Sequence, residues 1–309
     1  MKKTSLPSGW AGSYDRFFNF IETGAGRYAI LIDHIEKLKL NCSVISVAQN
    51  RHIFIFPPDQ KSLRASGGVF PFKGQSPYLL CAHYDRVEGS PGANDNSIAV
   101  FHLLNAALNL IARGAKNWLI IFTDKEELKA GETLEDQGSF TLAGKIKEWG
   151  LEKAKIFNFD CCGTGETFIV STTTDHILKD SQRPNINRIR KEITALRDHV
   201  LVTADNLRFE NILLAPTPFS DDAGFLRAGL ASQTITMLPS AEAAKYEVLL
   251  RRQPDFADLI ISGRINDPKE KRGLPGTWKN LNNASDTPSR LTPQFFDRAV
   301  RLMTELCVL

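Results

Sequence analysis

The sequence predicts one α/β domain with a mixed, mostly parallel sheet between layers of helices. Short apolar runs of strand length alternate with amphipathic helical patterns along most of the chain, which is typical of a sheet covered by helices on its faces. No internal repeat and no linker rich in Pro, Gly or Ser divides the 309 residues. We therefore expect residues 1–309 to form a single domain.

The expected elements follow the chain in order. Eight apolar runs bounded by polar or turn-forming residues predict strands at 42–47, 52–56, 78–82, 118–122, 156–159, 167–171, 212–214 and 232–237. Apolar residues at three- to four-residue spacing predict helices at 28–38, 98–111, 140–148, 186–198, 241–251 and 293–306. An N-terminal helical segment is expected over about 10–39. Residues 267–283 contain Gly and Pro interruptions without periodicity, so a flexible surface loop is expected there.

Charge and cysteine content narrow the class of protein. The 38 Lys and Arg residues nearly balance the 35 Asp and Glu residues, which argues against a nucleic acid or an anionic membrane as partner. No apolar stretch of a secretion signal or a spanning helix is present. The five cysteines, Cys42, Cys81, Cys161, Cys162 and Cys307, are scattered, which favours reduced, buried thiols. We expect a cytoplasmic location.

Acidic residues or a histidine follow three of the predicted strands. The set is His83 and Asp85 after the third strand, Glu126 and Glu127 after the fourth, Asp160 after the fifth, and Asp95 in the turn before the helix at 98–111. Because the carboxyl ends of parallel strands meet at one edge of a sheet, we expect these side chains to converge. One imidazole among several carboxylates suits a divalent metal, zinc in particular.

Each motif also has a purely structural interpretation. The His-x-Asp pair could form a hydrogen bond at a strand end, and the Glu-Glu pair could be a solvated acidic turn. Asp95 and Asp160 could cap helices. Their shared position after strands favours the metal site over these separate explanations. Other classes of enzyme are disfavoured, because no glycine-rich nucleotide motif follows a strand and no G-x-S-x-G elbow of a serine hydrolase occurs.

Six segments occur in unbroken order over roughly residues 78–290. They are His83-Tyr84-Asp85, Gly92-Ala93-Asn94-Asp95-Asn96, Glu126-Glu127, Asn158-Phe159-Asp160 with Gly163, Ser220-Asp221-Asp222 and Asn282-Asn283-Ala284-Ser285-Asp286-Thr287. In their order and their residues they resemble the motifs of the M28 family of zinc-dependent exopeptidases, which includes aminopeptidases, glutamate carboxypeptidases and glutaminyl cyclases. The resemblance implies a three-layer sandwich with about eight strands.

The resemblance also implies a set of metal ligands. His83, Asp95 and Asp160 would hold one Zn²⁺ ion. Asp95 would bridge to a second ion that Glu127 also binds. Both ions would lie where a peptide or a small amide is hydrolysed.

Two further carboxylates have roles implied by the resemblance. Asp85 would orient His83 by accepting the other ring N–H, which fixes the tautomer of the imidazole. Glu126 would act as general base toward the attacking water and then protonate the leaving amine.

The second metal position departs from the family's pattern. The family has a histidine ligand four residues before the Asp of a late His-Thr-x-x-Asp segment, and counting back from Asp286 gives Asn282. An amide oxygen suits Mg²⁺, Ca²⁺ or Mn²⁺ better than zinc. Asn282 is therefore a candidate ligand, with Asp286, His176 or His199 as alternatives. No histidine follows His199.

Two smaller departures lie near the expected site. The family's Ser-Asp-His is Ser220-Asp221-Asp222 here, and the run between Glu127 and Ser139 is longer than usual. This insertion could reshape the substrate pocket, although its outermost residues are expected at the surface. Trp278 could line the pocket or anchor its loop to the core.

Three hypotheses remain open from the sequence. The leading one is a metal-dependent exopeptidase of aminopeptidase type, acting on a peptide or small amide. The second is a non-catalytic family member that binds a ligand or has a structural role, which the missing histidine favours. The third is an acyltransferase like the glutaminyl cyclases, and it is disfavoured because those relatives depend on the altered metal position.

Overall fold

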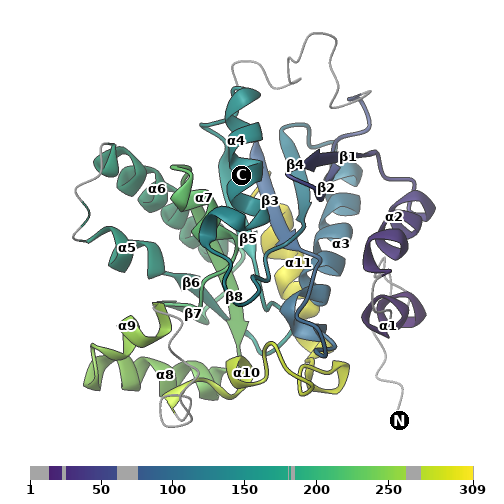
Figure 1. The fold of residues 1–309 in the computed structure, drawn as a ribbon. Coiled ribbons are helices and arrows are strands. Elements are labelled where there is room, and N and C mark those ends of the chain that lie inside the picture. The colour runs from purple at the N-terminus through teal and green to yellow at the C-terminus, as the bar shows by residue number, and fades with distance from the viewer. Residues whose placement is uncertain are drawn as a thin grey trace.

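We analysed a computed structural model, which describes residues 14–22, 26–60, 76–179, 181, 185–261 and 273–308. Within these residues one eight-stranded sheet has the order β1-β2-β4-β3-β5-β8-β6-β7 (Figure 1). The strands are β1 (Cys42–Val47), β2 (Asn50–Ile55), β3 (Tyr78–His83), β4 (Trp118–Thr123), β5 (Lys155–Phe159), β6 (Thr167–Ser171), β7 (Ile212–Ala215) and β8 (Ser232–Leu238). All eight predicted strands are thus confirmed, with ends that shift by at most two residues.

The sheet is mixed and mostly parallel, as predicted. Strands β4, β3, β5 and β8 are neighbours and run parallel. Strand β2 is antiparallel to both β1 and β4, and β6 is antiparallel to β8 but parallel to β7. The central parallel strands are buried, in keeping with their near-continuous apolar sequences.

Eleven α-helices are present in the described residues. They are α1 (Tyr14–Glu22), α2 (Arg27–Lys37), α3 (Ile98–Ala112), α4 (Gly138–Glu148), α5 (Thr173–Leu178), α6 (Ile186–Asn206), α7 (Asp221–Arg227), α8 (Ser240–Arg252), α9 (Phe256–Ile261), α10 (Gly276–Lys279) and α11 (Phe296–Glu305). The six predicted helices are confirmed, although α6 continues to Asn206 and a short turn at Pro293–Phe295 precedes α11.

Two predicted segments differ in detail. The expected N-terminal helical segment contains two helices, α1 and α2, and residues 10–13 and 23–25 lie outside the described residues. Within the expected loop at 267–283, residues 267–272 also lie outside them. The remainder contains α10, whose Trp278 is buried against Tyr246. This packing orders a segment whose sequence carries no helical periodicity.

Helices cover both faces of the sheet, and the alternation of side chains along the strands explains why. On β3, Leu80 and Ala82 belong to the core cluster that includes side chains of α3, α6 and α11. Leu79 and Cys81 belong to the cluster formed with α4 and α7. Figure 1 shows the sheet between these two layers, with α8, α9 and α10 grouped beyond β6 and β7.

The order of connections creates a switch point at the carboxyl end of β3. Helix α3 leads from β3 to β4 on one side, whereas α4 leads from β4 to β5 on the other side of β3. Because α3 and α4 lie on opposite faces of the sheet, the chain leaves β3 and β4 in opposite directions, and a crevice is expected at the carboxyl end of β3. Open α/β sheets bind ligands at such a crevice. No helix in the described residues is long and apolar enough to cross a bilayer.

The first residue of α4, Gly138, packs closely against the turn that follows β4. A Cβ atom at Gly138 would lie 1.7 Å from the carbonyl oxygen of Asp124, whereas one at Gly144 of the same helix would meet no atom within 4 Å. We predict that Gly138→Ala lowers the free energy of unfolding by roughly 1–3 kcal/mol. Gly144→Ala should be neutral or stabilising by up to about 1 kcal/mol. Urea denaturation of both variants checks this, and equal stabilities would contradict the close approach.

Candidate metal centre

The candidate centre lies at the carboxyl ends of the adjacent strands β4, β3 and β5. His83 is the last residue of β3, and Asp160 directly follows β5. Glu126 and Glu127 follow β4 after a short turn. Asp95 comes from the irregular turn Ala93–Ser97, which precedes α3. The convergence expected from the strand order is therefore present.

The imidazole of His83 is fully buried at the middle of this group. Its Nε2 atom lies 3.1 Å from Oδ1 of Asp95, 3.8 Å from Oδ1 of Asp160 and 4.0 Å from Oε2 of Glu126. None of these contacts has the geometry of a hydrogen bond. A nitrogen that is buried, surrounded by carboxylate oxygens and without a hydrogen-bond partner is the arrangement that a cation would complete.

Two groups of side chains among the described residues could each hold a metal ion. In both, the potential ligand atoms all lie within 4.8 Å of one another. One group is His83, Asp95 and Asp160, and the other is His83, Glu126 and Glu127. The first offers one imidazole nitrogen and two carboxylate oxygens, a donor set that fits zinc.

The electrostatics of the cluster show an excess of negative charge. Burial and the charges of nearby carboxylates raise the pKa of Glu127 to about 9 and the pKa of Glu126 well above its ordinary value. Burial and the charge of Asp160 raise the pKa of Asp95. Burial disfavours the charged form of His83, but the surrounding carboxylates, Asp160 foremost, raise its pKa well above the ordinary value. A divalent cation would offset this repulsion.

Asp85 has a second structural role that the sequence does not reveal. Its Oδ1 atom lies 3.5 Å from Nδ1 of His83, which is the side of the ring expected for an orienting carboxylate. It also accepts the backbone N–H groups of Glu126 at 3.1 Å and Glu127 at 3.0 Å, one on each carboxylate oxygen. Asp85 thus fixes the turn that carries both glutamates. Burial raises the pKa of Asp85, but the interaction with His83 and, after it, these two hydrogen bonds lower it, and the net pKa is below the ordinary value.

Gln137 is a site residue that sequence reasoning missed. Its buried side chain donates from Nε2 to Oε1 of Glu126 at 3.1 Å and accepts the hydroxyl of Ser139 at 3.0 Å. It lies directly before α4, inside the insertion that follows the Glu-Glu pair. A polar residue immediately before a helix is its only sequence signal, and that signal is common to many helix starts.

The Ser220-Asp221-Asp222 segment opens α7 and is buried. Asn158 donates to the hydroxyl of Ser220 at 2.9 Å, and the hydroxyl of Thr123 donates to Oδ2 of Asp221 at 2.5 Å. Asp222 accepts the backbone N–H of Ser220 at 3.0 Å. The segment therefore ties β4 and β5 to α7 through buried polar contacts.

Asn282 lies beside the metal group, on the opposite side of Asp95 from His83. One terminal atom of its amide is 2.7 Å from Oε1 of Glu127 and 3.3 Å from Oδ2 of Asp95. The predicted position of the late ligand is thus occupied by this residue.

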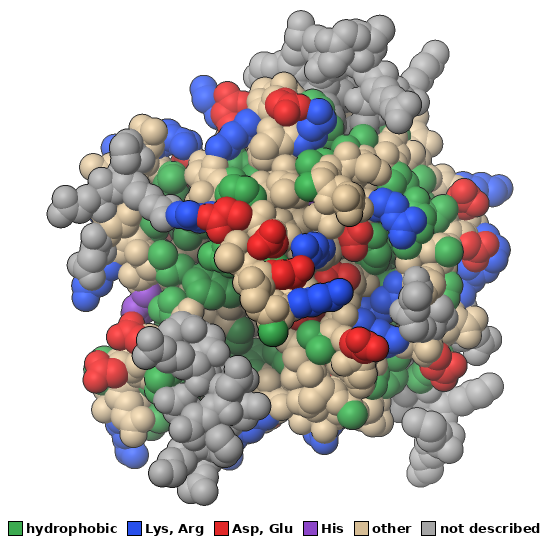
Figure 2. Space-filling model, in the orientation of Figure 1, with side chains coloured by type: hydrophobic (Ala, Val, Ile, Leu, Met, Phe, Trp, Pro, Cys, Tyr) green, Lys and Arg blue, Asp and Glu red, His purple; other side chains and the backbone are tan. Residues whose placement is uncertain are grey.

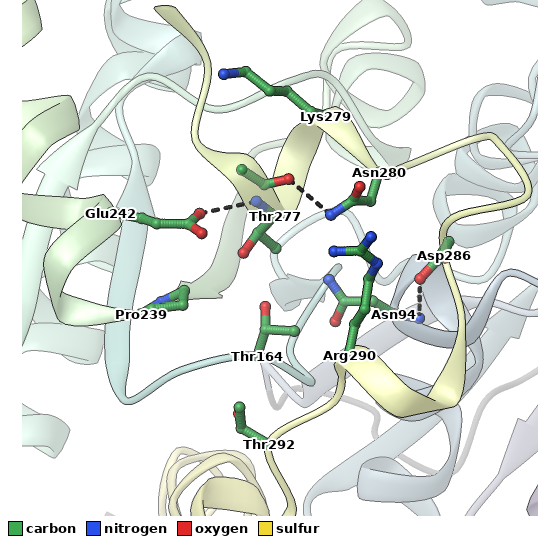
Figure 3. Close-up of a pocket in the computed structure, with 11 residues that line it drawn as sticks. Asn94, Thr164, Pro239, Glu242, Thr277, Lys279, Asn280, Asp286, Arg290 and Thr292 are labelled. Carbon is green, nitrogen blue, oxygen red and sulfur yellow. Dashed lines mark hydrogen bonds between the residues drawn. The ribbon is translucent and has the colours of Figure 1, made fainter.

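The three alternatives to Asn282 do not join the two metal-holding groups found among the described residues. Asp286 accepts the backbone N–H groups of Asn94 at 2.9 Å and of Asp95 at 3.0 Å. Figure 3 shows the first of these bonds at the edge of a neighbouring cavity of about 430 Å³. His199 stacks on Tyr78 and contacts the carbonyl of Leu306, and His176 lies exposed on α5.

A cavity of about 630 Å³ opens beside the metal group. The insertion after the Glu-Glu pair contributes Leu128, Glu132 and Leu134 to its wall, so the insertion does lie beside the site. Trp278 also lines the cavity while its ring packs at 5.1 Å against Tyr246, so both sequence interpretations of Trp278 hold. Figure 2 shows acidic and basic side chains together near the middle of the face that it draws.

Burial of Asp221 makes the stability of the protein depend on pH. Its pKa is raised from 3.8 to about 7, so between these values the folded protein binds more protons than the unfolded chain. This contribution to stability therefore falls as pH rises through that window. We predict that in Asp221→Asn the free energy of unfolding decreases less as pH rises, because the amide oxygen of Asn still accepts from Thr123 but the amide does not titrate. Urea denaturation between pH 5 and 8 in chelator checks this.

Asp258→Asn, at an exposed position on α9, is the control and should retain the wild-type pH dependence. Parallel stability curves for Asp221→Asn and the wild type would contradict the assignment of this pH dependence to Asp221.

Comparison with solved structures supports the same fold. The chain resembles the Legionella pneumophila aminopeptidase LapA (TM-score 0.61, 13% identity, covering 98% of this chain and 69% of that one). It also resembles the Porphyromonas gingivalis glutaminyl cyclase (TM-score 0.57, 16% identity, covering 96% of this chain and 98% of that one). A third similar structure is the zinc aminopeptidase BSAP of Bacillus subtilis (0.51, 20% identity, 83% and 49%), of which the chain spans about half the length. At these identities the likeness establishes the fold.

The family follows from the sequence pattern rather than from these structures. No curated protein matches the chain significantly. The pattern of Peptidase family M28, however, matches residues 69–303, which is most of the 309-residue chain and includes every strand from β3 to β8. The chain with His83, Asp95 and Asp160 at its switch point belongs to peptidase family M28.

Proposed function

We propose that the protein is a metal-dependent hydrolase that cleaves a peptide or small amide as an exopeptidase of aminopeptidase type. The observation that carries the proposal is the position of Glu126, which lies beside the buried group of His83, Asp95 and Asp160 and lines the same cavity. Membership of a peptidase family and the fold of zinc aminopeptidases support the reaction class.

His83, Asp95 and Asp160 are the residues that would hold the ion. A divalent cation bound there supplies Lewis acidity, which lowers the pKa of a water molecule and polarises a carbonyl oxygen. Oδ1 of Asp85 lies 3.5 Å from Nδ1 of His83, so Asp85 would orient the ring by accepting the Nδ1 proton, which leaves Nε2 facing the carboxylates.

Glu126 is suited to carry a proton between the attacking water and the leaving amine. The Oε1 atom accepts from Gln137, and Oε2 is the atom that approaches Nε2 of His83 at 4.0 Å. Burial raises the pKa of Glu126, which increases its affinity for a proton. Its backbone N–H donates to Asp85 and its carboxylate accepts from Gln137, so both the backbone and the side chain of Glu126 are held.

The charge of the cavity favours the amino-terminal end of a substrate. Acidic side chains in its wall are Asp95, Glu126, Glu127, Glu132 and Asp160. No Lys, Arg or His is among the described residues that line it. A cationic α-amino group is attracted to such a surface, whereas the carboxylate of a carboxyl terminus is repelled.

Two alternatives have specific observations in their favour. The replacement of the late histidine by Asn282 favours a non-catalytic relative, which full metal occupancy without hydrolysis across a broad peptide panel would support. The chain matches almost the whole length of a glutaminyl cyclase, which favours an acyltransferase. Release of ammonia from a peptide with an N-terminal glutamine would support that alternative.

Metal binding can be measured independently of turnover. We predict that zinc raises the melting temperature of chelator-treated protein and that His83→Ala abolishes the rise, because the imidazole is the only nitrogen donor in the group. At a zinc concentration of about 100 Kd the expected stabilisation is about 2.7 kcal/mol. His176→Ala, at an exposed position on α5, is the control and should keep the full rise. An unchanged rise in His83→Ala would place the metal elsewhere.

Turnover tests the role of Glu126. We predict that Glu126→Gln lowers kcat by a factor of about 10²–10⁴ while metal content stays unchanged, because the amide can neither take nor give the proton. Steady-state kinetics on aminoacyl anilides and short peptides, with metal analysis of the same samples, checks this. Glu148→Gln, at an exposed position on α4, should retain wild-type kcat. Wild-type turnover in Glu126→Gln would remove this residue from the mechanism.

A further inference from the structure

We propose that the carboxamide of Asn282 takes the position between Asp95 and Glu127 at which a second metal ion would lie, so that the centre binds one divalent ion. This inference rests on the proposed metal-dependent function and specifies the number of ions at its site.

The contacts of Asn282 identify the amide nitrogen as the group between the carboxylates. The terminal atom that faces them is 2.7 Å from Oε1 of Glu127 and 3.3 Å from Oδ2 of Asp95. Ionised carboxylate oxygens only accept hydrogen bonds, and an amide NH₂ group has two hydrogens to donate. With the nitrogen in this position, both contacts are hydrogen bonds. With the oxygen there, both Asp95 and Glu127 would have to be protonated for the same two contacts to be hydrogen bonds.

The two oxygens of Asp95 divide between the two sides of the centre. Oδ1 lies 3.1 Å from Nε2 of His83, whereas Oδ2 faces Asn282. The amide therefore uses the oxygen that a bridging carboxylate would offer to a second ion. It leaves the group of His83, Asp95 and Asp160 intact.

Hydrogen bonds to Asp286 hold the segment that carries Asn282 against the turn that carries Asp95. Asp286, four residues further along, accepts the N–H groups of Asn94 and Asp95 through its side chain, and its carbonyl accepts the N–H of Ala93 at 3.2 Å. These three bonds fasten the segment to the turn that carries Asp95, as Figure 3 shows for Asp286 and Asn94. Asn282 itself has φ 59°, a left-handed conformation that asparagine adopts readily.

The donor chemistry also disfavours zinc at the second position. If the amide turned its oxygen inward, the ligands would be two carboxylates and one amide oxygen, a set that suits harder ions. His83 is the one histidine in the two candidate metal groups of the described residues, and its Nε2 atom faces Oδ1 of Asp95, not the Oδ2 atom that Asn282 faces. A neutral amide that donates a hydrogen bond to each carboxylate stabilises both carboxylates without a second ion.

Zinc stoichiometry tests the inference. Chelator-treated protein comprising residues 1–309 is titrated with zinc by calorimetry, and the metal content of the dialysed samples is measured by mass spectrometry. We expect one equivalent in the wild type and two in Asn282→His, because an imidazole there supplies the missing nitrogen donor. Histidine is among the residues that tolerate positive φ. Ala284→His, two residues away at an exposed position, is the matched control and should bind one equivalent.

Each other result overturns the inference. Two equivalents in the wild type, one in Asn282→His, or two in Ala284→His would each show that residue 282 does not set the number of ions. No bound zinc in the wild type would overturn the metal centre of the proposed function as well, so the two failures are distinguishable. If Asn282→His does not fold, X-ray absorption of the wild type with excess zinc decides. A metal–metal separation of about 3.5–4 Å would contradict a single ion.

Discussion

The mutual repulsion of buried carboxylates around one imidazole is the constraint on which the rest of the site depends. Asp95, Glu126 and Glu127 all have raised pKa values, because burial and neighbouring negative charge disfavour their ionised forms. The protein surrounds them with neutral donors. The amide of Gln137 donates to Glu126, and the backbone N–H groups of Glu126 and Glu127 donate to Asp85. The amide nitrogen that we infer for Asn282 donates to Asp95 and Glu127. The carboxylate oxygens around Nε2 of His83 accept none of these hydrogen bonds, and this is where a cation would bind.

The topology of the sheet explains how residues far apart in the chain reach this point. The strand order places β4 and β5 on either side of β3, and the helices that follow β3 and β4 lie on opposite faces. Three strand ends therefore meet around a crevice, and each delivers its polar residues directly after a buried apolar run. The segment from Asn282 to Asp286 completes the group from the carboxyl-terminal part of the chain, because the Asp286 carboxylate accepts backbone N–H groups of the Asp95 turn.

The sequence was sufficient to predict elements with a local apolar pattern and the polar site residues that directly follow a strand. Apolar runs located all eight strands, and the order of motifs after them identified the side chains that converge. Helices of four to seven residues, such as α7 and α10, are too short for a periodic pattern. Partners across long sequence distances were also missed. The donation from Gln137 to Glu126 and the two hydrogen bonds that Asp85 accepts leave no trace in spacing. The single domain and cytoplasmic location stay predictions.

The most direct test of the account is the position of a zinc ion in a crystal of the protein grown or soaked with zinc, located by anomalous scattering at the zinc edge. The account predicts a peak bonded to Nε2 of His83 and to carboxylate oxygens of Asp95 and Asp160. A crystal in which zinc is bound only away from His83, or in which no zinc is bound, would contradict the account.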